Sequence, residues 1–461
     1  MPILTVDDPA TEEIAYHVQA AEVDAMGEVA AGAARAARAV TSLSLAERIA
    51  LCEDFCSTIE ARSDAIAADV TGQMGKPIRE ARAEVRTMLE RARYMISIAA
   101  DVLATRPAAA REGFELLVEK APVGVVLDIA AWNYPLLIPT NVVVPAILAG
   151  NAVVLKHSSR TPLCAGHFAA AFAEAGAPPA SVTALVAGHA ATAALIARPE
   201  IGYVAFTGSV EGGRQVSRAA AGRFIDVGLE LGGKDPAFVR ADADLDFAAE
   251  QIADGAFYNS GQSCCAVERV YVDRRVHDDF VARLAAAAAG RVPGDPTDDR
   301  TNLGAMAQQA GIETVARHVG DAVARGARLV AGGHRTQVGG RGRYFEATVL
   351  ADATEEMAVM REETFGPVAP VAAVGSDEEA VARMNDSSFG LTASLWTADA
   401  TRARELAGRI EAGTVFLNRC DYLDPALPWT GWKDSGVGLT LSRLGFDRMV
   451  RTRSYHFRLP R

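Results

Sequence analysis

Two motifs in the middle of the chain combine residue types that could carry out covalent chemistry. Residues 230–234 read Glu-Leu-Gly-Gly-Lys, and residues 257–265 read Phe-Tyr-Asn-Ser-Gly-Gln-Ser-Cys-Cys. Glycine lets backbone approach a ligand or a facing side chain more closely than any residue with a Cβ. The cysteines follow a small, polar turn, which presents a thiol on a loop and not in packed core. Because neighbouring side chains cannot both face the same way, we expect one of Cys264 and Cys265 to be available for chemistry.

A thiol needs assistance to act as a nucleophile at neutral pH. Its ordinary pKa is about 8.5, so a base or a cationic environment must help it ionise. No histidine lies close to the cysteine motif in the sequence, which leaves Glu230 as the available partner. A single cysteine is more often a small buried hydrophobe than a catalyst, and Cys52 and Cys56 are expected in one such buried helix stripe. The pairing of thiol and carboxylate is what indicates a site.

Length and composition limit the classes of function. A chain of 461 residues is too long for one core, and about 150 residues per domain suggests about three units. The net charge of −12 argues against nucleic acid or an anionic membrane as a partner. Six cysteines make no disulfide framework, and they lack the spacing of a metal site. Without a long apolar run or the residue order of a signal peptide, we expect a cytoplasmic protein.

Hydrophobic periodicity divides the chain into a helical start and two α/β units. Residues 11–105 read as helices, expected at 20–40, 44–70 and 78–104. Thereafter, short apolar strands alternate with helices, which is typical of parallel sheets covered on both faces, the doubly wound arrangement. The expected strands are 123–129, 152–156, 182–187, 203–206 and 224–229, then 236–239, 269–272, 345–350, 368–374, 391–396 and 413–417, with 331–343 as a glycine-rich surface loop.

Further motifs fall at strand ends, where ligands of such sheets bind. Residues 132–135 read Trp-Asn-Tyr-Pro, a rigid turn that could fix an amide beside a pocket. Lys156 ends a strand just before a helix whose start is expected at Thr161. Residues 206–213 read Phe-Thr-Gly-Ser-Val-Glu-Gly-Gly and begin a helix, where free N–H groups favour an anion. Residues 362–367 read Glu-Glu-Thr-Phe-Gly-Pro. Each motif alone could also be an ordinary turn or helix cap.

Together these motifs resemble the aldehyde dehydrogenase superfamily, whose paired signatures are Glu-Leu-Gly-Gly-Lys and Gly-Gln-x-Cys in this order. The resemblance implies oxidation of a small aldehyde to its acid with NAD(P). It makes Cys264 the nucleophile, Glu230 the base that activates water and Asn133 an oxyanion donor beside the Cys264 N–H. It also implies two doubly wound parallel-sheet domains and a small β segment that joins subunits into a homodimer or homotetramer. The implied division is 1–105 with 123–232 for NAD(P) binding, 233–447 for catalysis, and 106–122 with 448–461 for oligomerisation.

The resemblance also assigns a cofactor site. Family members often carry a glutamate, which pairs with the adenosine ribose and repels a 2′-phosphate, where this chain has Ser159. Arg160 is a nearby candidate to pair with that phosphate. We therefore expect NADP to be accepted at least as well as NAD. The implied cofactor-binding residues are Trp132, Lys156, Ser159, Arg160, Gly208, Ser209, Leu231, Glu363 and Phe365.

The substrate is less constrained by sequence. Arg419, or another arginine placed there by the fold, could bind the carboxylate of a semialdehyde such as succinic semialdehyde, although arginine is also common on solvated loops. Leu439 and Thr440 replace the family's usual Arg-Glu, so an acid that often helps to relay protons is absent and more weight falls on Glu230. By resemblance the aldehyde channel is lined by Tyr134, Ile138, Asn141, Tyr258, Ser263, Cys265 and the loop 418–424.

Three other interpretations stay open. A coenzyme-A-acylating variant would use the same thiol without a base that activates water, and the presence of Glu230 speaks against it. A cysteine hydrolase would need a well-placed histidine and no nicotinamide. A non-catalytic binding relative of the same fold is disfavoured because Cys264, Glu230, Asn133, Lys156 and Glu363 are all retained.

Overall fold

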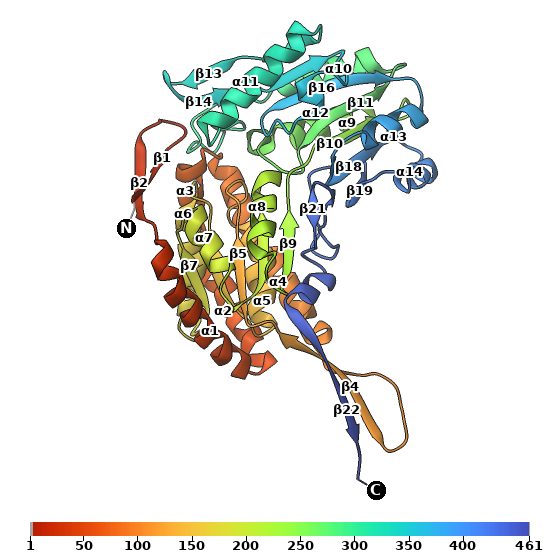
Figure 1. Cartoon of the computed structure of the whole chain (residues 1–461). Coiled ribbons are helices and arrows are strands. Elements are labelled where there is room, and N and C mark those ends of the chain that lie inside the picture. Colours follow the sequence, from red (N-terminus) through yellow and green to blue (C-terminus); the bar gives the residue numbers. More distant parts are fainter. Residues whose placement is uncertain (1–2, 461) are drawn as a thin grey trace.

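Two β-sheets flanked by helices make up the main body of the protein in the computed structural model, which describes residues 3–460 (Figure 1). Within those residues, one sheet has the strand order β21-β9-β8-β5-β6-β7 and the other the order β12-β15-β16-β11-β10-β18-β19. Most neighbouring strands are parallel, so the carboxyl ends of the strands meet at shared sheet edges. The expected α/β class with doubly wound parallel sheets is confirmed.

The first unit contains the six-stranded sheet. Its central strands are apolar and buried on both faces, and every residue of β5 is buried, which explains the uninterrupted Val/Leu/Ile runs. The strands are β5 (Val125–Ile129), β6 (Ala152–Lys156), β7 (Val182–Leu185), β8 (Ile201–Thr207), β9 (Asp226–Glu230) and the antiparallel β21 (Gly436–Val437). The helices are α1 (Met26–Ser42), α2 (Leu45–Ala61), α3 (Ser63–Met74), α4 (Ile78–Val102), α5 (Leu137–Leu148), α6 (Pro162–Glu174), α7 (His189–Ile196) and α8 (Val210–Ala220).

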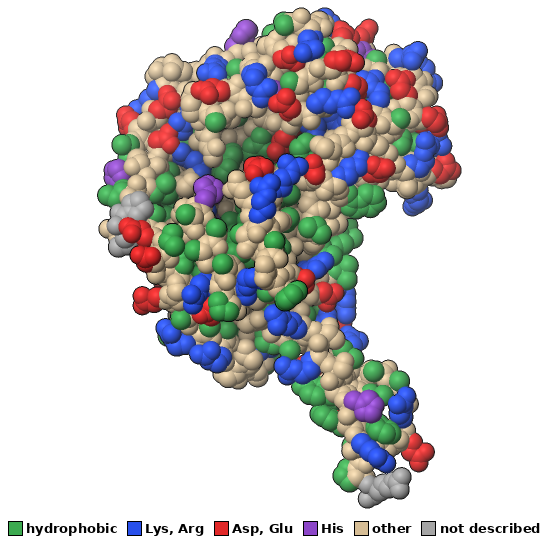
Figure 2. Space-filling model, viewed as in Figure 1, with side chains coloured by type: hydrophobic (Ala, Val, Ile, Leu, Met, Phe, Trp, Pro, Cys, Tyr) green, Lys and Arg blue, Asp and Glu red, His purple; other side chains and the backbone are tan. Residues whose placement is uncertain are grey.

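The second unit contains the seven-stranded sheet and carries the cysteine motif. Its strands are β10 (Asp235–Val239), β11 (Val267–Asp273), β12 (Arg328–Ala331), β15 (Thr348–Ala351), β16 (Val368–Val374), β18 (Thr392–Trp396) and β19 (Thr414–Leu417). Its helices are α9 (Leu245–Phe257), α10 (His277–Ala289), α11 (Gln309–Ala324), α12 (Ala358–Arg361), α13 (Asp377–Asn385) and α14 (Ala400–Ala407). Figure 2 shows the molecule hollowed where the two units meet.

An arm projects from the body (Figure 1). It consists of β3 (Arg106–Pro107), β4 (Phe114–Pro122) and β22 (Val450–Arg458), and β4 pairs antiparallel with β22 from end to end. Much of β22 is exposed. The two sequence segments expected to form one small β segment therefore do lie side by side, while their role in oligomerisation and the proposed domain boundaries remain predictions.

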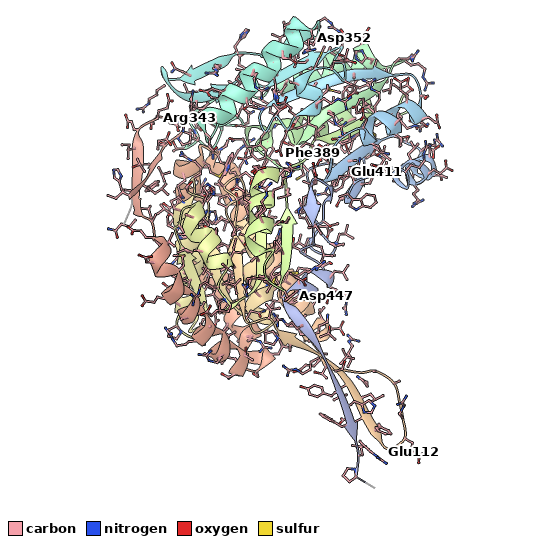
Figure 3. All side chains as sticks on the ribbon, in the orientation of Figure 1. Glu112, Arg343, Asp352, Phe389, Glu411 and Asp447 are labelled. Atoms are coloured by element: carbon pink, nitrogen blue, oxygen red, sulfur yellow. The ribbon has the colours of Figure 1, made fainter. Side chains whose placement is uncertain are left out.

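A hairpin near the N-terminus connects both units. Its strands are β1 (Ile3–Asp7) and β2 (Ile14–Gln19). The carboxylate of Asp7 accepts hydrogen bonds from Arg160, which precedes α6, and from Arg343, beside the hairpin in Figure 3. Burial alone would raise the pKa of Asp7, but the bonds from Arg343 and Arg160 outweigh it and hold the pKa below its usual value. One charged group thus joins three parts of the chain.

Some expected elements were wrong. Residues 14–19 form a strand and not a helix, since they pair with β1. The segment 44–70 is two helices, because the chain turns at Arg62 between α2 and α3. The expected surface loop 331–343 contains most of a hairpin, β13 (Arg335–Val338) with β14 (Arg341–Phe345), joined by two glycines. The short pair β17 (Phe389–Gly390) and β20 (Trp432–Lys433) lies in the chain's last part.

Candidate functional site

The thiol of Cys264 is presented by a tightly held loop after α9. Asn259 and Ser260 adopt left-handed backbone conformations with φ of 52° and 55°, which turn the chain sharply away from the helix. The Asn259 side-chain amide donates to the carbonyl oxygens of Asn133 and Gln262, each at 3.0 Å. These bonds fix the loop against the Trp-Asn-Tyr-Pro turn of the other unit, and Cys264 stays partly exposed at the junction.

The two glycines of the Glu-Leu-Gly-Gly-Lys motif are required by close approach. A Cβ on Gly233 would lie 2.3 Å from the backbone oxygen of Cys264, and one on Gly232 would lie 2.4 Å from Glu363 Oε2. Real Cβ atoms do not approach other atoms so closely, so any larger residue would push the cysteine loop or Glu363 away. The spacing seen in the sequence thus brings Glu230, Cys264 and Glu363 into one small region.

Glu230 lies at the end of β9, between two hydroxyl groups. Thr440 Oγ1 donates to one carboxylate oxygen at 2.5 Å, and Thr207 Oγ1 donates to the other at 3.3 Å. Burial raises the pKa of Glu230 to about 6, against the opposing effects of these hydroxyls and of the Arg91 charge. A carboxylate with this pKa is largely ionised at neutral pH and close to the optimum for a general base. Thr440, which replaces an acid in the family pattern, supplies a hydrogen bond to the Glu230 carboxylate.

A cavity of about 520 Å³ opens on one side of Cys264, at the carboxyl ends of the first sheet. Glu363 Oε1 accepts from the Gly233 N–H at 3.1 Å, and burial raises the Glu363 pKa to about 8. The rings of Trp132 and Phe365 meet edge to face with centroids 5.4 Å apart. The predicted residues that line this cavity are Trp132, Asn133, Lys156, Gly208, Ser209, Leu231, Glu363 and Phe365.

This cavity fits a dinucleotide. It begins at the N-terminus of α8, where Ser209 caps the helix by accepting from the Gly212 N–H, and backbone N–H groups at a helix start suit a phosphate. Lys156 at the end of β6 adds a positive charge, although burial lowers its pKa. The space beside Gly232 would be filled by any Cβ, so the motif keeps the cavity open.

Two predicted cofactor residues do not line this cavity. Ser159 is exposed, and its neighbour Ser158 lines the wall instead. The guanidinium of Arg160 donates to Asp7 and to the Gln73 carbonyl oxygen, the latter at 2.6 Å. The structure does not place Arg160, the sequence's candidate to pair with a 2′-phosphate, in this cavity, because each of its three nitrogens already donates to the N-terminal hairpin or to Gln73.

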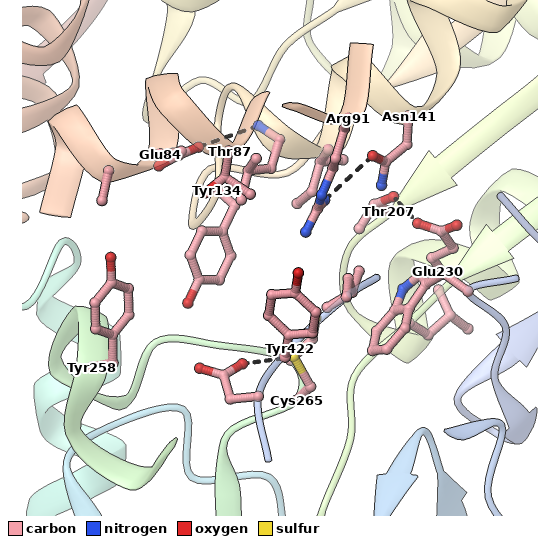
Figure 4. Close-up of a pocket in the computed structure, with 18 of the residues that line it drawn as sticks. Glu84, Thr87, Arg91, Tyr134, Asn141, Thr207, Glu230, Tyr258, Cys265 and Tyr422 are labelled. Carbon is pink, nitrogen blue, oxygen red and sulfur yellow. Dashed lines mark hydrogen bonds between the residues drawn. The ribbon is translucent and has the colours of Figure 1, made fainter. Parts of the chain in front are cut away.

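A second cavity, of about 210 Å³, opens on the other side of Cys264. The predicted channel residues Tyr134, Ile138, Asn141, Tyr258 and Cys265 line it (Figure 4). Among the residues that the structure describes, the two cavities share only Thr207, Glu230, Leu231 and Cys264. The thiol and the carboxylate thus stand where the two cavities meet.

Two predicted substrate residues lie outside the second cavity. Ser263 is buried behind it, with its hydroxyl donating to Asp421 Oδ1 at 3.1 Å. Arg419 is exposed, and its guanidinium lies 3.5 Å from the ring centroid of Tyr422, so it does not reach the cavity. The cation that does line the cavity is Arg91 of α4. Its signal in the sequence is a charge in register with Met88 and Met95 on the apolar stripe of that helix.

Comparison with known proteins identifies the family. The model of the aldehyde dehydrogenase family matches residues 3–455. The chain belongs to the aldehyde dehydrogenase family. It is an NAD(P)-dependent oxidoreductase that acts on aldehydes, as the paired motifs predict. The resemblance inferred from the motifs is confirmed.

Individual aldehyde dehydrogenases resemble the chain over nearly its whole length. The succinate-semialdehyde dehydrogenase [NADP(+)] 1 of Mycobacterium tuberculosis (strain ATCC 25618 / H37Rv) is 37% identical over 447 residues, which cover 96% of this chain and 97% of the relative. The crystal structure of an NAD-dependent aldehyde dehydrogenase from Sinorhizobium meliloti matches with a TM-score of 0.96 and 35% identity, covering 100% and 92% of the two chains. An indole-3-acetaldehyde dehydrogenase solved with NAD+ matches with a TM-score of 0.96 and 32% identity, covering 99% and 93%.

Residues 3–460 contain neither a cluster of potential metal ligands nor a membrane-spanning helix. In that part of the chain, His, Cys, Asp and Glu side chains form no group of three or more that could hold a metal ion. None of its helices is both long and apolar enough to cross a membrane.

Proposed function

We propose that Cys264 is the nucleophile and Glu230 the general base of aldehyde oxidation, with Asn133 and the Cys264 N–H as the oxyanion donors. One observation carries this proposal: Cys264 and Glu230 both line the narrow junction between a cavity that fits a dinucleotide and a smaller cavity that fits an aldehyde. A group at this junction can contact both reactants. No other thiol in residues 3–460 lines both cavities.

The proposed reaction has two halves. The Cys264 thiolate adds to the aldehyde carbon, and the negative charge that develops on oxygen is held by the Asn133 amide and the Cys264 N–H. Bound NAD(P) supplies the hydride acceptor, and loss of hydride converts the adduct on sulfur into a thioester. Glu230 then removes a proton from water, whose oxygen attacks the thioester carbon and releases the carboxylic acid and the thiolate.

We propose that Lys156 and Glu363 hold the two ends of the cofactor. Lys156 ends β6 and would bind the adenosine ribose, while Glu363 can accept from the hydroxyls of the nicotinamide ribose. The packing of Phe365 on Trp132 gives that end of the cavity a rigid aromatic wall. The loop 362–367, which carries Glu363 and Phe365, is further fixed because Glu268 accepts a hydrogen bond from the Phe365 N–H at 2.8 Å.

Two variants test the catalytic roles. Cys264→Ala should produce no NAD(P)H from any aldehyde, whereas the matched variant Cys420→Ala, whose thiol lies outside both cavities, should retain turnover. Glu230→Gln should still release one equivalent of NAD(P)H in a rapid burst and then stall at thioester hydrolysis. NAD(P)H production by Cys264→Ala, or an unaltered steady-state rate in Glu230→Gln, would overturn the proposal.

We further propose that NADP is accepted at least as well as NAD, because neither Ser158 nor Ser159 places a carboxylate where a 2′-phosphate would lie. The name of the NADP-linked mycobacterial relative supports this, and the structural relatives named for NAD support acceptance of NAD as well. The kcat/KM for each nucleotide in the wild type and in Ser158→Glu, at the serine that lines the cavity, provides the test. Ser158→Glu should shift preference towards NAD; a wild type that favours NAD a hundredfold would refute the proposal.

The arm formed by β3, β4 and β22 is proposed to join subunits into a homodimer or homotetramer. Its support is an exposed, projecting sheet in which, among residues 3–460, the outer edge of β22 has no partner strand. Light scattering on the intact chain would measure the assembly, and a monomer at micromolar concentration would refute this role of the arm.

A cytoplasmic location, and the absence of nucleic-acid and membrane partners, remain predictions from composition.

A further inference from the structure

The aldehyde cavity contains a buried cation without a counter-ion. Arg91 lies on α4 with only 5% of its surface exposed. Nη1 donates to Asn141 Oδ1 at 3.3 Å, Nε has no hydrogen-bond partner, and within residues 3–460 Arg91 forms no ion pair. An unpaired buried charge is costly to folding, so an anionic ligand that supplies the missing partner would be bound favourably.

The acids that line the same cavity do not supply the missing counter-ion. Each already has its own hydrogen-bond or ion-pair partners, and Glu230, whose charge Arg91 does sense, is held by two threonine hydroxyls at hydrogen-bond distance. Burial lowers the pKa of Arg91, but an arginine stays charged at neutral pH. The other pairs are Glu84 with Lys76 at 2.5 Å, Asp254 with Arg291 at 3.4 Å, and Asp421 with Ser263 at 3.1 Å and Cys265 at 2.9 Å.

Neutral hydroxyl donors share the cavity with this cation. In Figure 4 the guanidinium of Arg91 and the hydroxyl of Tyr422 point towards one another, and Tyr134 and Tyr258 also line the cavity. A guanidinium with free N–H groups matches the two oxygens of a carboxylate. A doubly charged phosphate is disfavoured, since Glu230 and Asp421 line the same small space.

We propose that Arg91, oriented by Asn141, binds the distal carboxylate of the substrate, so that the preferred substrates are short aldehydes with a carboxylate at the other end. This rests on the proposed function, because the aldehyde carbon must reach Cys264 while its carboxylate reaches Arg91. Succinic semialdehyde, a short member of this class, is the substrate in the name of the mycobacterial relative. The product of such an oxidation is a dicarboxylate.

The test compares succinic semialdehyde with its neutral analogue 4-oxobutanamide, which has the same length. The wild type should favour the semialdehyde, mainly through a lower KM. In Arg91→Met the kcat/KM for the semialdehyde should fall by about 100-fold, the range expected when one partner of a buried charged hydrogen bond is removed, and the neutral analogue should lose far less. Arg91→Lys should recover part of the loss, and the control Arg419→Met should keep the wild-type ratio between the two substrates.

A measurement on the wild type tests the same proposal without a variant, so it remains valid if Arg91→Met does not fold. Succinate should inhibit competitively against the semialdehyde at concentrations at least about tenfold lower than butyrate. Equal inhibition by the two acids, equal kcat/KM for the two aldehydes in the wild type, or equal losses for both in Arg91→Met would each overturn the role of Arg91. If the wild type instead oxidises neither aldehyde with either nucleotide, it is the proposed function that fails.

Discussion

Thr440 gives a quantitative test of how the pKa of Glu230, the proposed base, is set. Its hydroxyl donates to Glu230 Oε1 at 2.5 Å, whereas the Thr207 hydroxyl lies at 3.3 Å from the other oxygen. Thr440→Val keeps the shape of the side chain and removes the shorter bond. Because that bond stabilises the ionised carboxylate, its loss should raise the Glu230 pKa above the present value of about 6.

The size of the effect follows from the energy of the bond. A hydrogen bond to a charged group contributes about 1.5–3 kcal/mol, which corresponds to about 1–2 pKa units. With a rise of about 1.5 units, the ionised fraction of Glu230 at pH 7 would fall from about nine-tenths to about one-quarter. Thioester hydrolysis should therefore slow about fourfold at pH 7 and be almost unchanged at pH 9.

The assay is the pH dependence of the steady-state rate, with the burst of NAD(P)H measured alongside. The acid limb of the profile should move to higher pH in Thr440→Val, move much less in Thr207→Val, and return in Thr440→Ser. The burst amplitude should stay near one equivalent per active site. A Thr440→Val profile that overlays the wild type, or that is lowered equally at all pH values, would refute this account of the base.

Two further substitutions test carboxylates that pair with buried cations. Asp7→Asn should lower the free energy of unfolding by about 1–3 kcal/mol in urea at pH 7, because Arg160 and Arg343 lose their carboxylate. Since the Asp7 pKa is held below 3.8, this difference should be complete above that pH and disappear as the pH falls further; a difference that persists in acid would contradict it. Glu268→Gln should destabilise by about 3–5 kcal/mol, because Lys234 stays buried without its partner at 2.5 Å, and should raise the KM for the cofactor through the Phe365 loop. Thermal unfolding and cofactor titration check this, and a variant as stable as the wild type would refute it.

Sequence predicted the sheets well because their strands are buried on both faces. The apolar runs at 152–156 and 368–374 coincide with β6 and β16. Because both faces of such strands are buried, the whole strand is apolar and can be recognised without an alternating pattern. The hairpin at 335–345 was missed because its turn glycines suggest a loop and its strands are short, with β13 partly exposed. Similarly, β2 has an exposed face, and only its partner β1 makes it a strand.

The site was predicted unevenly for a related reason. Glu230 and Cys264 belong to motifs with fixed spacing, so the sequence already indicated that they would act together. For an arginine, the position along the chain does not tell where its long side chain ends. Arg419 lies on the expected loop but stacks outside the cavity on Tyr422, whereas Arg91 enters the cavity from α4. Its only signal in the sequence is a charge on an apolar helix stripe.

The β1–β2 hairpin has a consequence for how the enzyme can be altered. The Asp7 carboxylate accepts hydrogen bonds from Arg160 in one unit and from Arg343 in the other. It therefore connects the two units that border the larger cavity. A segment that lines neither cavity thus helps to hold the walls of the larger one together. Substitutions in this hairpin are therefore expected to alter the larger cavity from a distance, by changing how firmly the two units are held together.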